Sequence, residues 1–131
     1  MHHRTNNEYD LSHIWTDNED IRSLKSLILF GIRGMAAYAY HAMVLGYTND
    51  EVSHFFVKAL FALGEDWEMD KLLPIVMELG KVNLVCMEML DKANTETYGI
   101  PTPTTIDLKV EKGPFIIISG HDLLDLKLLL E

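Results

Sequence analysis

A histidine that directly follows a short apolar run is the residue of this sequence most favourably placed for chemistry. The run covers residues 115–119, is rich in isoleucine, and has Gly-Pro before it and Gly-His121 after it. This pattern predicts a buried strand that ends in a tight turn, with a helix over 121–131 behind it. In open α/β sheets, ligands bind in the crevice beyond the carboxyl ends of the strands. His121 is therefore a candidate ligand-binding residue.

The residue types around His121 leave two roles open. A neutral imidazole at such a turn can present one ring nitrogen to a metal while a carbonyl or carboxylate fixes the other. Asp122 or Asp125 is available as that carboxylate. Helix capping or packing is the commoner role of a histidine at a turn, and the residue types alone favour it over metal binding.

Glu51 and His54 form an E-x-x-H pair, the i, i+3 spacing that di-iron bundle proteins place on facing helices. Such a site needs two of these pairs and two further glutamates, and the sequence holds one pair. Glu51 is also the acidic member of a predicted capping box that starts at Thr48. Val52 and Phe55 occupy the face that a metal site would need, so we interpret the pair as structural.

The cysteine and the other histidines and methionines within the predicted helices fit structural roles. Cys86 has apolar neighbours and no basic residue at helical spacing, which predicts a buried structural thiol rather than a nucleophile. His41 is interpreted as a histidine of the core or its boundary. The methionines are predicted to fill an irregular core. They are Met35, Met43, Met77, Met87 and Met89.

Composition narrows the class of protein. The formal net charge is −9 and the basic residues form no cluster, which argues against nucleic acid and anionic membranes as partners. A single cysteine excludes an intramolecular disulfide, and no secretory leader is visible, so a cytoplasmic location is expected. The apolar stretch 27–45 is interrupted by Arg33 and His41, which favours a buried bundle helix over a membrane span. The sequence contains no P-loop, no dinucleotide-binding glycine fingerprint and no nucleophile elbow.

Hydrophobic periodicity predicts three consecutive helices. The first helix covers about 18–45 and is preceded by a capping box at 16–19. The second follows a capping box at 48–51 and ends at Gly64. The third is expected to be regular from about Leu73 to Asn94, because a proline such as Pro74 is tolerated only in the first turn of a helix. Short connections make neighbouring helices antiparallel. The expected inner faces are Ile21, Leu24, Ile28, Met35, Ala39 and Ala42; Val52, Phe55, Phe56, Ala59, Leu60 and Leu63; and Leu72, Val76, Leu79, Asn83, Met87 and Leu90.

The predicted fold class is mainly α: a three-helix bundle followed by the first strands and helix of a truncated α/β domain. We expect a polar, disordered leader over 1–14, the bundle over 15–98, and a proline-rich linker over 99–104. Residues 105–131 are interpreted as the start of a Rossmann-like domain, with strands over 105–110 and 115–119. A parallel sheet needs further strands, which this sequence does not supply.

Four ordered motifs resemble the hybrid-cluster proteins, also called prismane proteins or hydroxylamine reductases. They are Asp20-Ile21-Arg22-Ser23-Leu24-Lys25, Gly31-Ile32-Arg33-Gly34-Met35-Ala36-Ala37-Tyr38-Ala39-Tyr40-His41-Ala42, Leu90-Asp91-Lys92-Ala93-Asn94-Thr95-Glu96-Thr97-Tyr98-Gly99 and Ile118-Ser119-Gly120-His121-Asp122-Leu123. The similarity runs from about Trp15 to Glu131. It corresponds to an interior slice of a longer family chain, namely the later helical bundle of the first domain and the entry to the second.

The resemblance implies a redox function for the complete protein. Members carry an iron–sulfur cubane and a hybrid iron–sulfur–oxygen cluster, reduce hydroxylamine to ammonia with an electron donor, and are also credited with nitric oxide turnover. The histidine of the glycine-histidine-aspartate turn, His121 here, is implied to bind an iron of the hybrid cluster. The cubane cysteines are absent from 1–10, and the other hybrid-cluster ligands would lie beyond Glu131. Because iron–sulfur clusters are anchored mainly by thiolates, we expect this chain alone to bind no cluster and to be inactive.

The alternative is a helical interaction or oligomerisation module without catalysis. A bundle face that normally packs against the rest of a larger protein would favour self-association. Unpaired strand edges in the truncated tail would favour the same outcome.

Overall fold

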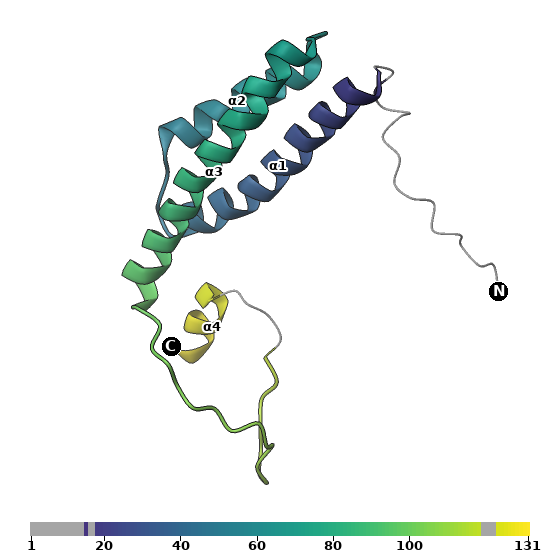
Figure 1. Cartoon of the computed structure of the whole chain (residues 1–131). Helices are drawn as coiled ribbons and strands as arrows, with labels where there is room; N and C mark the ends of the chain where they lie inside the picture. Colours follow the sequence, from purple (N-terminus) through teal and green to yellow (C-terminus); the bar gives the residue numbers. More distant parts are fainter. Residues whose placement is uncertain (1–14, 16–17, 119–122) are drawn as a thin grey trace, which may run out of the picture.

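The computed structural model describes residues 15, 18–118 and 123–131. Its helices are α1 (Glu19–Val44), α2 (Asp50–Gly64), α3 (Met69–Tyr98) and α4 (Leu123–Leu130). The first three alternate in direction, so that α1 and α3 run the same way and α2 runs opposite to both (Figure 1). The prediction of a mainly helical protein with three long helices packed together is confirmed.

The core of the bundle follows a strict heptad pattern on all three helices. Buried residues recur with alternating steps of three and four along each helix, the spacing of knobs-into-holes packing. On α1 this seam includes Lys25, which is 4% exposed. The buried residues are Ile21, Lys25, Ile28, Ile32, Met35 and Ala42 on α1; Val52, Phe55, Ala59 and Ala62 on α2; and Leu72, Ile75, Leu79, Val82, Cys86 and Ala93 on α3.

This seam corrects part of the predicted core. On α1 the predicted face is largely right, whereas on α2 Leu60 is 57% exposed. On α3 the predicted face drifts outward after Leu79, so that Met87 is 44% exposed while Cys86 is fully buried. A 3.6-residue period diverges from a 3.5-residue seam along a long helix, and α3 is the longest of the three.

Both predicted capping boxes are misplaced, because an asparagine caps each helix. The Oδ1 of Asn18 accepts a hydrogen bond from the N–H of Ile21 at 2.9 Å, and that of Asn49 accepts one from Val52 at 3.2 Å. Asparagine is at least as good an N-cap as threonine. Glu51 therefore lies at the second helical position rather than the third and is not the acidic member of a capping box.

The ends of α1 and α3 use glycines in the left-handed region. Gly46 has φ +87°, its N–H donates to the carbonyl of Met43, and that of Tyr47 donates to Ala42, which is a Schellman motif. Gly99, with φ +90°, closes α3 by donating to Thr95. The predicted end of the first helix is confirmed, whereas α3 is one turn longer at each end than expected and holds Pro74 inside it.

The predicted strands are wrong for the residues that the structure describes. Residues 99–118 form an extended connection that leads away from the bundle, and α4 returns beside the end of α3 (Figure 1). Within that connection Leu108 is 98% exposed and Ile117 is 80% exposed. A β-branched run becomes a strand only when its backbone groups pair with a neighbouring strand, and no residue of 99–118 is part of a strand in this structure. The helix expected over 121–131 is present from Leu123 onward.

Among the described residues, α1 alone has the length and composition of a membrane-crossing helix. An 18-residue window of it has a mean hydropathy of 1.3, and 22% of that window is buried. Core helices of soluble proteins meet the same criteria. In this structure one face of α1 supplies Ile28, Ile32 and Met35 to the core of the bundle.

Substitution by alanine should have opposite effects on the free energy of unfolding at two glycines of α1. A Cβ at Gly31 would lie 2.3 Å from Cδ2 of Leu79, which is held in the core, whereas a Cβ at Gly34 meets nothing within 4 Å. Alanine is favoured over glycine in a helix by about 0.8–1.0 kcal/mol. We expect Gly34→Ala to raise the free energy of unfolding by roughly that amount. Gly31→Ala should lower it, because overpacking typically costs about 1–3 kcal/mol. Urea denaturation of the two variants checks this, and equal effects would contradict the close α1–α3 packing at Gly31.

Candidate functional site

A cavity of about 500 Å³ lies where the ends of α1 and α3 meet the first turn of α4. Its size is that of a small-molecule site. The lining residues are Ala37, Tyr38, Tyr40, His41, Val44 and Leu45 from α1 and its cap, Leu90, Asn94 and Tyr98 from α3, and Leu123, Leu124 and Asp125 from α4.

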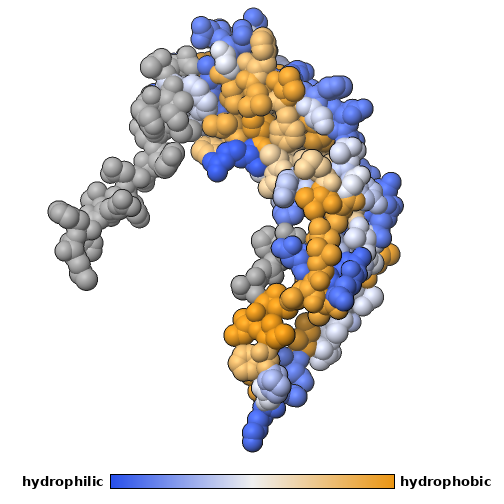
Figure 2. Space-filling model, turned by 180° about the vertical axis from the view of Figure 1, so that it is seen from behind, coloured by the Kyte–Doolittle hydropathy of each residue, from blue (hydrophilic) through white to orange (hydrophobic). Residues whose placement is uncertain are grey.

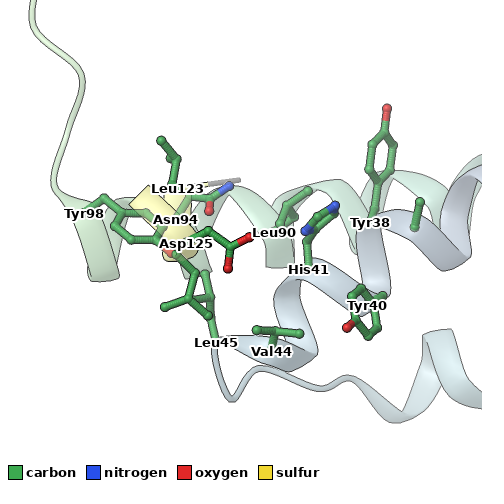
Figure 3. A pocket seen from close by; sticks show the side chains of 12 residues that line it. Tyr38, Tyr40, His41, Val44, Leu45, Leu90, Asn94, Tyr98, Leu123 and Asp125 are labelled. Carbon is green, nitrogen blue, oxygen red and sulfur yellow. The ribbon is translucent and has the colours of Figure 1, made fainter. Parts of the chain in front are cut away.

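Polar groups from all three helices face this cavity. Figure 3 shows four polar side chains around this cavity. They are the imidazole of His41, the carboxamide of Asn94, the phenol of Tyr98 and the carboxylate of Asp125. The ring of His41 also meets that of Tyr40 edge to face, with 5.9 Å between centroids. The described lining residues thus offer hydrogen-bond donors and acceptors and one carboxylate against apolar walls. They are suited to hold a small polar group.

The predicted iron ligand, His121, lies two positions before Leu123 in the sequence, and Leu123 is the first residue of α4. His121 and Asp122 lie outside the described residues, so the structure does not test their predicted roles. The next residue, Leu123, lines the cavity. Asp125, the other carboxylate considered as a partner for His121, lines it as well.

A tyrosine–glutamate contact fixes the end of α3 that forms one wall of the cavity. The hydroxyl of Tyr47, in the α1–α2 connection, donates a hydrogen bond to Oε2 of Glu96 on α3. Nζ of Lys92 lies 4.0 Å from Oε1 of the same carboxylate. Because Asn94 and Tyr98 flank Glu96, this contact orients the last turns of α3 against the end of α1.

The Tyr47 contact predicts a pH-dependent contribution to stability. The hydrogen bond to Glu96, partial burial and the negative charge of Glu96 all raise the pKa of Tyr47 above its ordinary value of 10.0. A pKa raised on folding means that the stabilisation is complete below pH 10.0 and is lost as the pH rises through the folded-state value. We expect Tyr47→Phe to unfold at a lower urea concentration than the unmodified chain at neutral pH. That gap should close in alkali, and a gap that stays constant with pH would contradict the assignment.

The E-x-x-H pair does not form a metal site in the described part of the chain. Glu51 and His54 are exposed on α2, while Val52 and Phe55 between and beside them are each 2% exposed in the core. The expectation that Val52 and Phe55, rather than Glu51 and His54, occupy the core face of α2 is confirmed, whereas the capping-box role predicted for Glu51 is wrong.

Cys86 is a buried thiol, as predicted. It is 0% exposed, and its Sγ lies 3.6 Å from the carbonyl oxygen of Met35, to which it donates a weak hydrogen bond. Burial raises the pKa of this thiol above its ordinary value of 9.0, which disfavours the thiolate that a nucleophile or metal ligand requires.

The methionines only partly fill the core. Met35 is 1% exposed and Met89 packs against the core. Met43 and Met77 are 53% and 61% exposed, so the predicted core role is wrong for them, as it is for Met87. The predicted boundary position of His41 is confirmed, since its side chain is half-buried at the cavity.

The described residues do not fit a complete metal or iron–sulfur site. Within residues 15, 18–118 and 123–131, no three His, Cys, Asp or Glu side chains are grouped closely enough to hold a metal ion. An iron–sulfur cluster requires several thiolates. The one thiol is buried in the bundle seam and faces a backbone carbonyl.

Sequence reasoning missed most of the residues that line the cavity. Tyr38 and His41 are three residues apart on α1, and Asn94 and Tyr98 are four apart on α3, so each pair shares a helix face. These spacings were the only indication in the sequence that the residues of each pair lie together. The cavity forms where the ends of different helices meet, and that meeting depends on the connections at Gly46 and 99–118. Local sequence pattern does not specify how these connections fold.

Comparison with known proteins identifies a family. Residues 3–131 match the model of the Prismane/CO dehydrogenase family. A hydroxylamine reductase of Methanosarcina mazei is 50% identical over 117 residues, which are 88% of this chain and 22% of that protein. Hydroxylamine reductases of Methanocaldococcus jannaschii and Chlorobaculum tepidum are 49% identical over 125 residues and 54% identical over 112 residues, covering 95% and 86% of this chain. The chain spans about a fifth of the length of these relatives, 23% and 21% for the last two.

Proposed function

The chain belongs to the Prismane/CO dehydrogenase family, and on that premise we propose that it is a segment of a hydroxylamine reductase-type hybrid-cluster oxidoreductase. The observation that carries the proposal is identity of about 50% over most of the chain to proteins named hydroxylamine reductase. The complete protein would reduce hydroxylamine with two electrons and two protons, breaking the N–O bond to give ammonia and water. An electron donor supplies the electrons, and nitric oxide is a second candidate substrate.

Within that protein, this segment would contribute a scaffold and one iron ligand. We assign His121 to an iron of the hybrid cluster, on the resemblance of its glycine-histidine-aspartate turn to that of the family. The cluster's other ligands, and the cubane, would belong to the four fifths of the family chain that have no counterpart here. The described residues supply no thiolate for a cluster, so the isolated chain should bind none and lack reductase activity. The cavity beside α4 would form the bundle-side wall next to this ligand.

The location and domain limits stay predictions. We propose a cytoplasmic protein without nucleic-acid or membrane partners, on its net charge of −9 and on the part that α1 takes in the bundle core. The limits 1–14, 15–98, 99–104 and 105–131 await limited proteolysis.

A chimera tests the proposed function. This chain would replace the matching 117 residues of the Methanosarcina mazei relative, and ammonia formed from hydroxylamine would be measured under anaerobic conditions with a reduced dye. We expect the chimera to form ammonia and the isolated chain to form none. A folded, iron-loaded chimera without activity, or an active isolated chain, would refute the proposal.

A helical module without catalysis is the second candidate. It is favoured by large apolar side chains on the outer face of α2, where Val57, Leu60 and Phe61 are 69%, 57% and 58% exposed. Sedimentation equilibrium of the isolated chain separates the candidates. A stable oligomer favours the module, and a monomer favours the segment of a reductase.

A further inference from the structure

The outer face of α1 and α3 carries a groove that the site described above does not include. It has a volume of about 390 Å³. Its residues are Leu27, Phe30, Gly31, Gly34, Met35 and Tyr38 of α1 and Val76, Leu79, Gly80 and Asn83 of α3. Figure 2 shows that apolar surface gathers on the bundle and continues towards the C-terminal part of the chain.

The groove combines apolar walls with a glycine floor. Leu27 and Phe30 are 53% and 49% exposed on its rim. Gly34 and Gly80 have no atom within 4 Å of an added Cβ, so the bundle itself does not fill the space above them. Glycines on a helix surface allow another backbone to approach closely. A groove of this form fits an apolar helix.

The ten residues that line the groove include no acidic or basic residue, although Asp, Glu, Lys and Arg are 24% of the sequence. The one charged group placed against its rim is the guanidinium of Arg33, whose Cζ lies 5.8 Å from the centroid of the Phe30 ring. Depletion of charged residues is typical of the core of an interface. Two copies of this chain would repel each other through their net charge, which argues against a second copy as the occupant.

The composition of α1 leads to the same conclusion. An 18-residue window of α1 has a mean hydropathy of 1.3, yet 22% of that window is buried here. Contiguous exposed apolar surface commonly marks an interaction site. The Methanosarcina mazei relative, of which the chain covers 22%, has 78% of its length without a counterpart in this structure. That length provides ample chain to cover α1.

We propose that the α1–α3 groove is the docking surface for an uncharged, apolar helix from the remainder of a hydroxylamine reductase-type polypeptide. The helix would lie over Gly34 and Gly80 between the side chains of Leu27, Phe30 and Tyr38. Tyr38 lines the cavity beside α4 as well, so the groove and that cavity share one residue. The proposal rests on the proposed function, namely that this chain is a segment of a longer hydroxylamine reductase-type polypeptide, and it does not depend on the role of His121.

Hydroxyl-radical footprinting measures whether the groove is covered. The probe is the chimera in which this chain replaces the matching segment of the Methanosarcina mazei relative, compared with the isolated chain in lipid-free buffer. Phe30 should be oxidised readily in the isolated chain, in keeping with its 49% exposure. In the chimera its oxidation rate should fall to that of Phe55, which is 2% exposed and serves as the buried control of the same residue type. Equal oxidation of Phe30 in both proteins would overturn the proposal.

A matched pair of substitutions tests the same surface without depending on protection. Gly80→Phe fills the groove, and Lys81→Phe adds the same bulk at the next exposed position, which does not line it. We expect both isolated variants to unfold at or above the temperature of the unmodified chain. In the chimera, Gly80→Phe alone should lower the thermal midpoint, by about 5 °C or more.

Three results would contradict this assignment. If Gly80→Phe unfolded the isolated chain, the groove would belong to the core of the bundle and would not be a docking surface. A dimer of the isolated chain that protects Phe30 and is abolished by Gly80→Phe would make a second copy the occupant. Partition of the isolated chain into lipid vesicles, with Phe30 protected there, would make it a membrane surface. Hydroxylamine reduction is not a readout in any of these experiments, so an uncovered groove and a loss of catalysis in the chimera are distinguishable results.

Discussion

Replacing Leu72 by alanine should lower the free energy of unfolding of this chain by about 2–5 kcal/mol. Leu72 is 0% exposed in the α3 seam and packs in the core shared with α1 and α2. Truncation removes apolar contacts and leaves a cavity, because helices joined by short connections cannot collapse fully around it. Small domains are stable by roughly 5–15 kcal/mol, so the loss is a large part of the total.

Leu84→Ala is the matched control for this prediction. Leu84 is the same residue type on the same helix and is 66% exposed. Its truncation should change the free energy of unfolding by no more than about 0.5 kcal/mol. Urea titration followed by circular dichroism at the helix signal gives both values. Similar losses for the two variants would contradict the heptad seam, since that seam places Leu72 inside and Leu84 outside.

Replacing His121 by alanine in the chimera should abolish the hybrid cluster and lower hydroxylamine reduction by at least about 100-fold. The expected cause is loss of an iron ligand from a cluster whose remaining ligands lie elsewhere in the polypeptide. Iron per chain should fall by the share of the hybrid cluster, and the spectroscopic signal of the cubane should persist. Iron analysis and electron paramagnetic resonance of the purified proteins make this measurement.

The control for His121 is His54→Ala, which removes an exposed histidine of α2. Surface substitutions away from a site are usually close to neutral, so iron content and activity should stay within about twofold of the chimera. If His121→Ala retained the full iron content, the assignment of His121 as a ligand would fail, whereas the family assignment would be unaffected.

The helices could be predicted from the sequence because their signals are local. Apolar spacing located all three long helices, and Gly46 marked the end of α1 correctly. The starts were placed less well because asparagine competes with threonine for the N-cap. The predicted buried face of α3 is wrong beyond Leu79. Which of two neighbouring apolar residues is buried there depends on contacts with α1 and α2, and a local period does not specify those contacts.

The tail shows where local pattern is insufficient. The run 115–119 has the composition of a buried strand, yet its described residues are exposed and unpaired. Strand formation requires a paired neighbour, and among the described residues no strand forms beside 99–118. The cavity beside α4 is likewise non-local, since it joins His41, Tyr98 and Asp125 across 84 positions (from 41 to 125). By contrast, the family could be identified from the order of four motifs, which does not depend on how the tail folds.

The most direct test is the content of iron and acid-labile sulfide per chain, measured on the isolated protein purified without oxygen. If this segment supplies a scaffold and the single ligand His121, both values should be near zero, since one buried thiol and one histidine cannot anchor a cluster. The chimera, prepared in the same way, should contain both elements. Several irons per isolated chain, accompanied by sulfide, would contradict the account and indicate a cluster shared between copies of the chain.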